Sequence, residues 1–219
     1  FDDSEVKEIE RIVRDYLVRN PSVMREVFTA LEAEEEARRR EQLVSAIGDN
    51  REALLASDAD AVLGNPDGDV TLVEFFDYRC AYCRRVVPSM QALLDEDRDL
   101  RVVFKDLPVL GPDSVRAARA ALASRMQDGY VPFHFALMAA DDLSIEGIRA
   151  AAAAVGLDPD RLEADMASPE VIAAIEANYA LADELGIEGT PAFVIGDQLI
   201  PGAIDKARLE QLIREARSG

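Results

Sequence analysis

Two cysteines separated by two residues, Cys80 and Cys83, are the side chains of this sequence with the clearest chemical potential. They are the only cysteines among 219 residues, too few for a disulfide scaffold. A pair at this spacing can alternate between dithiol and disulfide, with one thiolate attacking a foreign disulfide and the other resolving the mixed disulfide. We expect Cys80 to attack and Cys83 to resolve.

The residues around the pair predict how it is held. Residues 70–76 are rich in branched and aromatic side chains, which is typical of a strand, and a helix is expected from about Cys80 to Asp95. Cys80 then stands at a helix start, where free N–H groups lower a thiol pKa from about 8.5 to about 3.5–7.5. A stabilised thiolate favours the reduced pair and makes its disulfide more oxidising.

Two other uses of the cysteines stay open, a structural disulfide and half of a metal site. His134 is the only histidine, so a zinc cluster of Cys and His cannot be assembled within one chain, and we expect it to be a surface or packing residue. Paired thiolates still suit Cu(I), which leaves a copper site at Cys80 and Cys83 open. We expect no resident cofactor, and we assign the scattered methionines to packing.

Further strands and helices indicate an α/β domain over residues 49–219. A second strand at 100–105 follows the helix, and this strand-helix-strand order predicts a parallel pair. Residues 112–185 are helical in pattern and form an insertion. The sheet resumes near 192–195 with a following hairpin, and a last helix covers about 205–217.

Residues 1–48 form a helical appendage with two amphipathic stretches, interrupted at Pro21 and capped by Ser4 and Ser22. Their apolar positions are Val6, Ile9, Val13 and Tyr16, then Met24, Val27, Phe28 and Leu31. These faces either pack on their own domain or pair with copies of themselves, and we favour self-association. The charged run 34–40 is either a solvated helix face or a helical connector.

Composition excludes several classes of function. Lys and Arg total 24 against 43 Asp and Glu, and a formal charge of −19 argues against binding along nucleic acid. The strongly apolar run at 70–76 contains Glu74 and is far shorter than the roughly 20 residues that span a bilayer. Because the first residue is Phe1, we expect a processed or trimmed, exported mature chain.

The stretch from Glu74 to Cys83, together with Gly189-Thr190-Pro191, resembles the DsbA-like thiol-disulfide oxidoreductases of the bacterial periplasm over about residues 60–217. The resemblance implies a thioredoxin fold in which Pro191 is the cis-proline that faces the cysteines and leaves backbone free for substrate. It also implies that Thr190 tunes the pair. Ala81 and Tyr82 stand where strong oxidants of the family often carry Pro and His, which implies a milder oxidant.

Glu74 matches a buried acid of that family, and two interpretations of it stay open. In the first, its carboxylate can accept a proton near Cys83. In the second, its charge is compensated by a nearby partner, such as Lys105 on the next strand.

The long N-terminal appendage is similar to that of the suppressor of copper sensitivity protein C group. Members of this group can trimerise through an N-terminal helical stalk and act as disulfide isomerases, so the resemblance implies a periplasmic homo-oligomer, with a trimer as the expected assembly. It further implies disulfide-containing protein substrates and a membrane-bound reductase as redox partner. A dithiol oxidase and a copper-binding or copper-tolerance protein are the alternatives.

Overall fold

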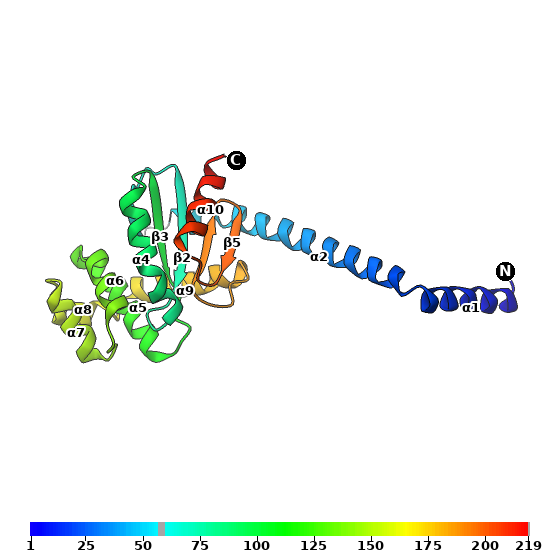
Figure 1. Ribbon diagram of the computed structural model, residues 1–219. Coiled ribbons are helices and arrows are strands. Elements are labelled where there is room, and N and C mark those ends of the chain that lie inside the picture. Colours follow the sequence, from blue (N-terminus) through cyan, green and yellow to red (C-terminus); the bar gives the residue numbers. More distant parts are fainter. Residues whose placement is uncertain (57–59, 219) are drawn as a thin grey trace. The chain divides into compact units, whose positions relative to one another are not determined.

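The computed structural model describes residues 1–56 and 60–218, which form two compact units, Phe1–Val44 and Ser45–Gly219 (Figure 1). Within the described ranges, no helix combines the length and the apolar character that a membrane crossing requires.

The first unit consists of α1 (Asp3–Arg19) and most of α2 (Pro21–Asp49). The expected caps are wrong by a residue or two. Asp2 caps α1, since its Oδ1 accepts from the backbone N–H groups of Ser4 and Glu5 at 2.8 and 2.9 Å, and the Glu5 side chain bonds back to its N–H. Helix α2 begins at Pro21, a residue favoured in the first turn, so Ser22 lies inside the helix.

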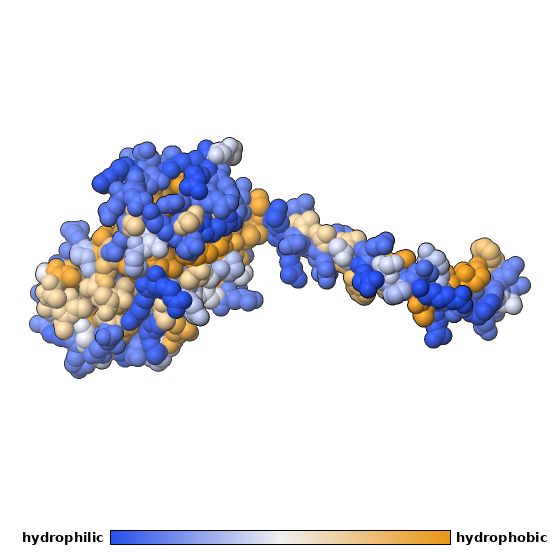
Figure 2. Space-filling view, viewed as in Figure 1, coloured by the Kyte–Doolittle hydropathy of each residue, from blue (hydrophilic) through white to orange (hydrophobic). Residues whose placement is uncertain are grey.

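The apolar side chains of the first unit stay on its surface. No residue of α1 is buried, and Figure 2 shows hydrophobic atoms exposed along both helices. Within this unit the exposed fraction is between 37% and 57% for the eight apolar residues of the two amphipathic stretches, Val6, Ile9, Val13, Tyr16, Met24, Val27, Phe28 and Leu31. An amphipathic helix normally buries its apolar face, and these two helices do not bury their apolar faces within the unit.

A five-stranded mixed sheet with the order β1-β3-β2-β4-β5 organises the second unit. Strands β2 (Val70–Phe76) and β3 (Leu100–Asp106) pair in parallel, as the strand-helix-strand order predicts. The other neighbours are antiparallel and add β1 (Ala61–Gly64), β4 (Ala192–Ile195) and β5 (Gln198–Pro201). The sequence patterns did not anticipate β1 or the short helix α3 (Arg51–Leu55) before it.

The two faces of the sheet are covered by different helices because side chains of a strand alternate between faces. Leu72 and Phe76 of β2 belong to a hydrophobic cluster with residues of α4 (Ala81–Glu96) and α10 (Lys206–Ser218). On the other face, α3 contacts β2 and α9 (Pro169–Glu184) contacts β3. The start of α4, which carries the cysteines, therefore lies at the end of the central strand β2.

The insertion expected at 112–185 is helical, and its helices gather together in Figure 1. They are α5 (Pro112–Ser124), a 3₁₀ turn at Arg125–Gln127, α6 (Tyr130–Ala139), α7 (Ile145–Ala154), α8 (Pro159–Asp165) and α9. Helix α5 contacts all the others and is lined with buried alanines, which allow close approach of helices.

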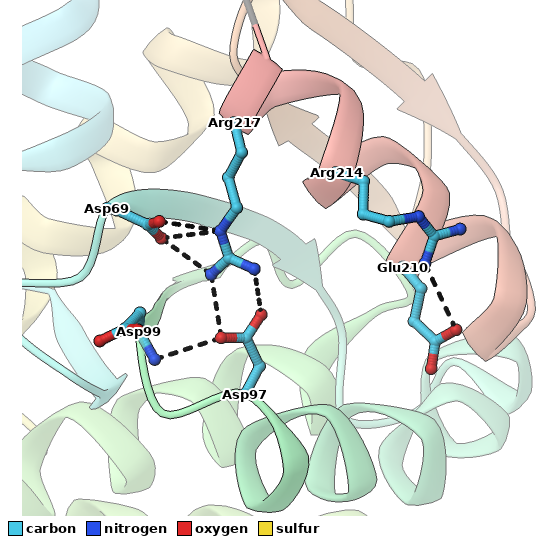
Figure 3. A network of polar contacts seen from close by, with 6 residues as sticks. All are labelled: Asp69, Asp97, Asp99, Glu210, Arg214 and Arg217. Atoms are coloured by element: carbon cyan, nitrogen blue, oxygen red, sulfur yellow. Dashed lines mark hydrogen bonds and ion pairs between the residues drawn. The ribbon is translucent and has the colours of Figure 1, made fainter.

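The C-terminal helix is joined to the sheet by an ion-pair network (Figure 3). Arg217 binds Asp69, just before β2, and Asp97, just after α4, with hydrogen bonds of 2.8–3.0 Å. Its guanidinium lowers the pKa of both carboxyl groups. The network is partly exposed. It fixes the end of α10 near the first residue of β2, whereas the cysteines follow the last residue of that strand.

Candidate thiol-disulfide centre

Cys80 is the N-cap residue of α4, and both cysteines are free thiols. The Cys80 Sγ accepts a hydrogen bond from the backbone N–H of Cys83 at 3.4 Å, as an N-cap side chain does. The backbone N–H of Cys80 donates to the carbonyl of Asp77 at 3.0 Å, closing the turn between β2 and α4. The local sequence thus places the first sulfur directly over the free N–H groups of a helix start.

Thr190 and Pro191 lie beside the pair, although they are 110 residues away from Cys80 in the sequence. The Cys80 Sγ donates to the Thr190 carbonyl at 3.3 Å, and the Thr190–Pro191 peptide bond is cis. Strand β4 begins at the next residue, Ala192, and pairs with β2. The sheet therefore brings the Thr-Pro segment and the Cys-x-x-Cys turn together.

The two cysteines differ in their surroundings. Cys83 has an exposed fraction of 0%, and burial raises the pKa of its thiol strongly, against smaller opposing effects of the Asp77 backbone and the Thr190 side chain. Cys80 is also buried, with an exposed fraction of 5%, but it stands at the N-cap of α4 rather than inside the helix. Cys83 is therefore held as the protonated partner of the pair.

The intervening residues Ala81 and Tyr82 are exposed. The Tyr82 ring has 57% exposure, and the Arg85 guanidinium carbon lies 5.0 Å from its centroid, a cation–π contact. The dipeptide thus forms the outer rim of the centre and faces any molecule that approaches Cys80.

Glu74 is buried in β2, on the face that α4 covers, because it alternates with Val73 and Phe75. Burial raises its pKa to about 8. The interpretation in which Lys105 is the partner of Glu74 is wrong. Lys105 pairs in register with Phe75, so its side chain projects from the face of the sheet opposite to that of Glu74. There its Nζ binds Asp60 Oδ2 and the Ala53 carbonyl at 2.5 Å each.

The residue that sequence reasoning missed is Asp77, with 1% exposure. Its Oδ1 accepts from the Arg79 N–H at 2.7 Å and from the Ser114 hydroxyl at 2.8 Å, and its Oδ2 accepts from the Leu110 N–H at 2.9 Å. An Asp three residues before the first cysteine was the only local signal, and its partners at 110 and 114 lie too far along the chain for a spacing argument.

A second polar cluster lies beneath the turn. The Tyr78 hydroxyl is 3.0 Å from His134 Nδ1, and the Tyr130 hydroxyl donates to Asp106 Oδ2 at 3.2 Å. Burial lowers the pKa of His134 to about 3, so the imidazole is neutral, and its ring stacks on Phe104 with centroids 4.4 Å apart. The interpretation of His134 as a packing residue is confirmed, and its position as a surface residue is excluded.

Cys80 and Cys83 are also potential ligands of a metal ion. Over the described part of the chain, no three side chains of His, Cys, Asp or Glu gather in a way that could hold a metal ion. The two thiols are the groups of this centre that suit a soft metal ion.

Comparison with known proteins supports a redox centre. Residues 71–214 match the family model of the DSBA-like thioredoxin domain, and residues 5–38 match that of the Copper resistance protein ScsC N-terminal domain. A thioredoxin-like oxidoreductase from Silicibacter pomeroyi is 46% identical, covers 78% of this chain and 99% of its own, and superposes with a TM-score of 0.76.

Two further relatives differ in how much they share with this chain. Proteus mirabilis ScsC in a transitional conformation is 30% identical, covers 100% of this chain and 97% of its own, and has a TM-score of 0.73. The Na(+)/H(+) antiporter NhaA of Herminiimonas arsenicoxydans is 34% identical over 163 residues, which are 73% of this chain and 26% of the antiporter. The chain thus spans about a quarter of the length of the antiporter relatives it matches.

Proposed function

The chain belongs to the DSBA-like thioredoxin domain family and is a thiol-disulfide oxidoreductase of the DsbA and ScsC type, and from this premise we propose that it is a periplasmic disulfide isomerase or reductase. The observation that carries the proposal is the asymmetry of the pair, with Cys80 at a helix start and Cys83 buried and held protonated. Misoxidised proteins are the proposed substrates.

The chemistry follows from this asymmetry. The Cys80 thiolate attacks one sulfur of a substrate disulfide, a mixed disulfide forms, and the second substrate sulfur leaves as a thiolate. A substrate thiolate can then attack the mixed disulfide, which forms the rearranged bond and returns Cys80 without net oxidation. Because burial disfavours the Cys83 thiolate, its competing attack is slow, and the substrate has time to rearrange.

The competing attack has its own outcome. When Cys83 does lose its proton and attacks the Cys80 sulfur, the Cys80–Cys83 disulfide forms and the substrate leaves reduced. Glu74 lies on the face of β2 that α4 covers, and its pKa of about 8 leaves a fraction of the carboxyl group ionised near neutral pH, which is the fraction that can accept the proton of Cys83. A membrane-bound reductase is the partner that would restore the dithiol.

The exposed apolar residues of the first unit support self-association, since such a face is normally buried. The match of residues 5–38 to the ScsC N-terminal domain supports the same proposal. We place the association in α1 and the first half of α2, and a trimer is the assembly the family implies. Association would hold several Cys80 sites together and shield them from an oxidising partner.

The test compares three full-length proteins. Ile9→Asp with Phe28→Asp disrupts the apolar faces, whereas Thr29→Asp with Gln42→Asp adds the same charge at exposed polar positions of the same unit. We expect the first variant to be a monomer in light scattering and to lose at least about tenfold in reactivating a scrambled-disulfide protein. The second should behave as the parent chain.

Two outcomes would contradict the proposal. A parent chain that is monomeric removes the association, and one that oxidises reduced substrates without reactivating scrambled ones favours the dithiol oxidase. For an oxidase, the pair should also be found as a disulfide in cells.

A copper function is supported by the match of residues 5–38 to the Copper resistance protein ScsC N-terminal domain and by two free thiols three residues apart. Titration with Cu(I) against a chelator of moderate affinity tests it. Competition that Cys80→Ser abolishes would support copper binding at the pair, and no competition would remove this function.

A further inference from the structure

We propose that Asp77 is a positioning residue of the thiol-disulfide centre, whose carboxylate fastens the cysteine turn to the segment Leu107–Gly111 and to α5. The proposal rests on the proposed thiol-disulfide exchange and adds a residue through which the fold sets the rate of that exchange. Its basis is the set of contacts that this one buried side chain makes.

Asp77 receives three hydrogen bonds from two separate parts of the chain. The Arg79 N–H belongs to the cysteine turn itself, whereas the Leu110 N–H and the Ser114 hydroxyl belong to the segment that follows β3. All three are 2.7–2.9 Å long, the range of well-formed hydrogen bonds to a carboxylate. The carboxylate is thus a clamp between the turn and α5.

The same junction is closed by other contacts. The Arg79 guanidinium donates to the Leu110 carbonyl at 2.9 Å, and the Leu107 N–H donates to the Phe76 carbonyl at 2.8 Å. Gly111 has a φ of 105°, which favours glycine and lets the chain turn from Leu110 into α5. Leu110 and Ser114 can therefore both reach Asp77.

The backbone of Asp77 contacts both cysteines. Its carbonyl accepts from the Cys80 N–H at 3.0 Å, and its backbone lowers the pKa of the Cys83 thiol, which burial raises. A tilt of this residue would move Cys80 relative to its two sulfur contacts, the Cys83 N–H and the Thr190 carbonyl. Small displacements of a nucleophile have large effects on rate.

Because Asp77 is buried, the three donors bind its carboxylate in place of water. Removal of the side chain leaves the Arg79 and Leu110 N–H groups without this acceptor, a loss that structures avoid by moving. We therefore expect the turn to shift away from α5 when Asp77 becomes alanine. Asparagine keeps one oxygen, which can still accept from the Arg79 N–H and the Ser114 hydroxyl, and loses only the Leu110 contact.

The test measures the second-order rate of exchange between each reduced full-length protein and a peptide disulfide, from pH 5 to 9. We expect Asp77→Ala to be slower by at least about tenfold. Asp77→Asn should stay within about threefold of the parent chain, because it restores most of the hydrogen bonds.

A second pair of variants keeps the test informative if Asp77→Ala does not fold. Ser114 and Ser124 are both fully buried serines of α5, but Ser114 bonds Asp77 whereas Ser124 bonds the Ala121 carbonyl of its own helix. We expect Ser114→Ala to slow the exchange severalfold and Ser124→Ala to leave it unchanged.

Three results would overturn the proposal. The first is an Asp77→Ala protein that melts at a lower temperature yet exchanges at the parent rate, because the residue is then purely structural. The second is an equal exchange rate for Asp77→Asn and Asp77→Ala, because the negative charge is then the cause. The third is an equal exchange rate for Ser114→Ala and Ser124→Ala, because the contact with α5 then has no part in the exchange.

Failure of the proposed exchange is recognised separately. It shows as a parent chain that does not react with the peptide disulfide. The rate at which iodoacetamide alkylates Cys80 at a fixed pH then still tests the clamp, with a slower reaction expected for Asp77→Ala and one near the parent rate for Asp77→Asn.

Discussion

Glu74→Gln should make the stability of the protein less dependent on pH. The carboxyl group of Glu74 is buried in β2, and burial raises its pKa from 4.5 to about 8. In the unfolded chain the same group ionises near 4.5, so the folded state binds the proton more tightly. Glutamine has the shape of the protonated acid and cannot ionise.

The sign and size follow from linkage between proton binding and folding. Because the folded pKa is the higher one, the stability associated with the protonated group is complete below about pH 4.5 and is lost as the pH rises toward 8. At about 1.4 kcal/mol per pKa unit, the full difference is about 5 kcal/mol. Between pH 5 and pH 8 the parent chain should lose about 3.5 kcal/mol that Glu74→Gln does not lose.

The assay is urea unfolding of the reduced proteins at pH 5 and pH 8, followed by circular dichroism. Comparison with the variant removes the contribution of other groups that titrate in this range, among them Asp106, whose pKa burial also raises to about 8. Glu176→Gln changes an exposed glutamate of α9 and serves as the control. It should shift stability equally at both pH values.

One result would refute this reasoning. If Glu74→Gln and the parent chain differ in free energy of unfolding by the same amount at pH 5 and pH 8, Glu74 is ionised in the folded protein at both. A cation or a set of N–H donors would then have to offset the cost of burying its charge.

Three other substitutions have defined outcomes. Asp60→Asn leaves the Lys105 ammonium buried without its carboxylate and should lower the free energy of unfolding by about 3–5 kcal/mol in urea titration. Thr190→Val removes a hydroxyl that lowers the Cys83 pKa, so the reduction potential measured in a glutathione buffer should change while the melting temperature stays near the parent value. An unchanged potential and an unchanged turnover would count against a tuning role of Thr190. Ala120→Leu forces a larger side chain into fully buried space on α5 and should cost about 1–3 kcal/mol, measured by urea unfolding.

Much of the fold could be predicted because its signals are local. The branched residues of β2, the cysteines after it and the Thr190-Pro191 pair before β4 each mark an element within a few positions. Strand β1 has only four residues and pairs antiparallel with β3, and nothing in so short a stretch distinguishes a strand from a loop.

Residue spacing predicted the site only where its groups are neighbours in sequence, whereas the place of Thr190 and Pro191 beside the cysteines followed from the family resemblance. The partner of Lys105 was missed because pairing depends on which face of the sheet a residue leaves, and the parallel register places Lys105 with Phe75 rather than with Glu74. The clamp at Asp77 joins groups 33 and 37 residues apart. The boundary between residues 48 and 49, the subunit number and the redox partner remain predictions.

The contact between Asp77 and Ser114 also determines which parts of this protein could be exchanged with those of a relative. The dipeptide Ala81-Tyr82 is exposed, so grafting another dipeptide there should be tolerated. Helix α5 cannot be exchanged as freely, because it carries Ser114, which donates to the Asp77 carboxylate. A chimera with the helical insertion of a relative would need a hydrogen-bond donor at position 114 to bind the Asp77 carboxylate. Homologous sequences should therefore show paired changes at positions 77 and 114.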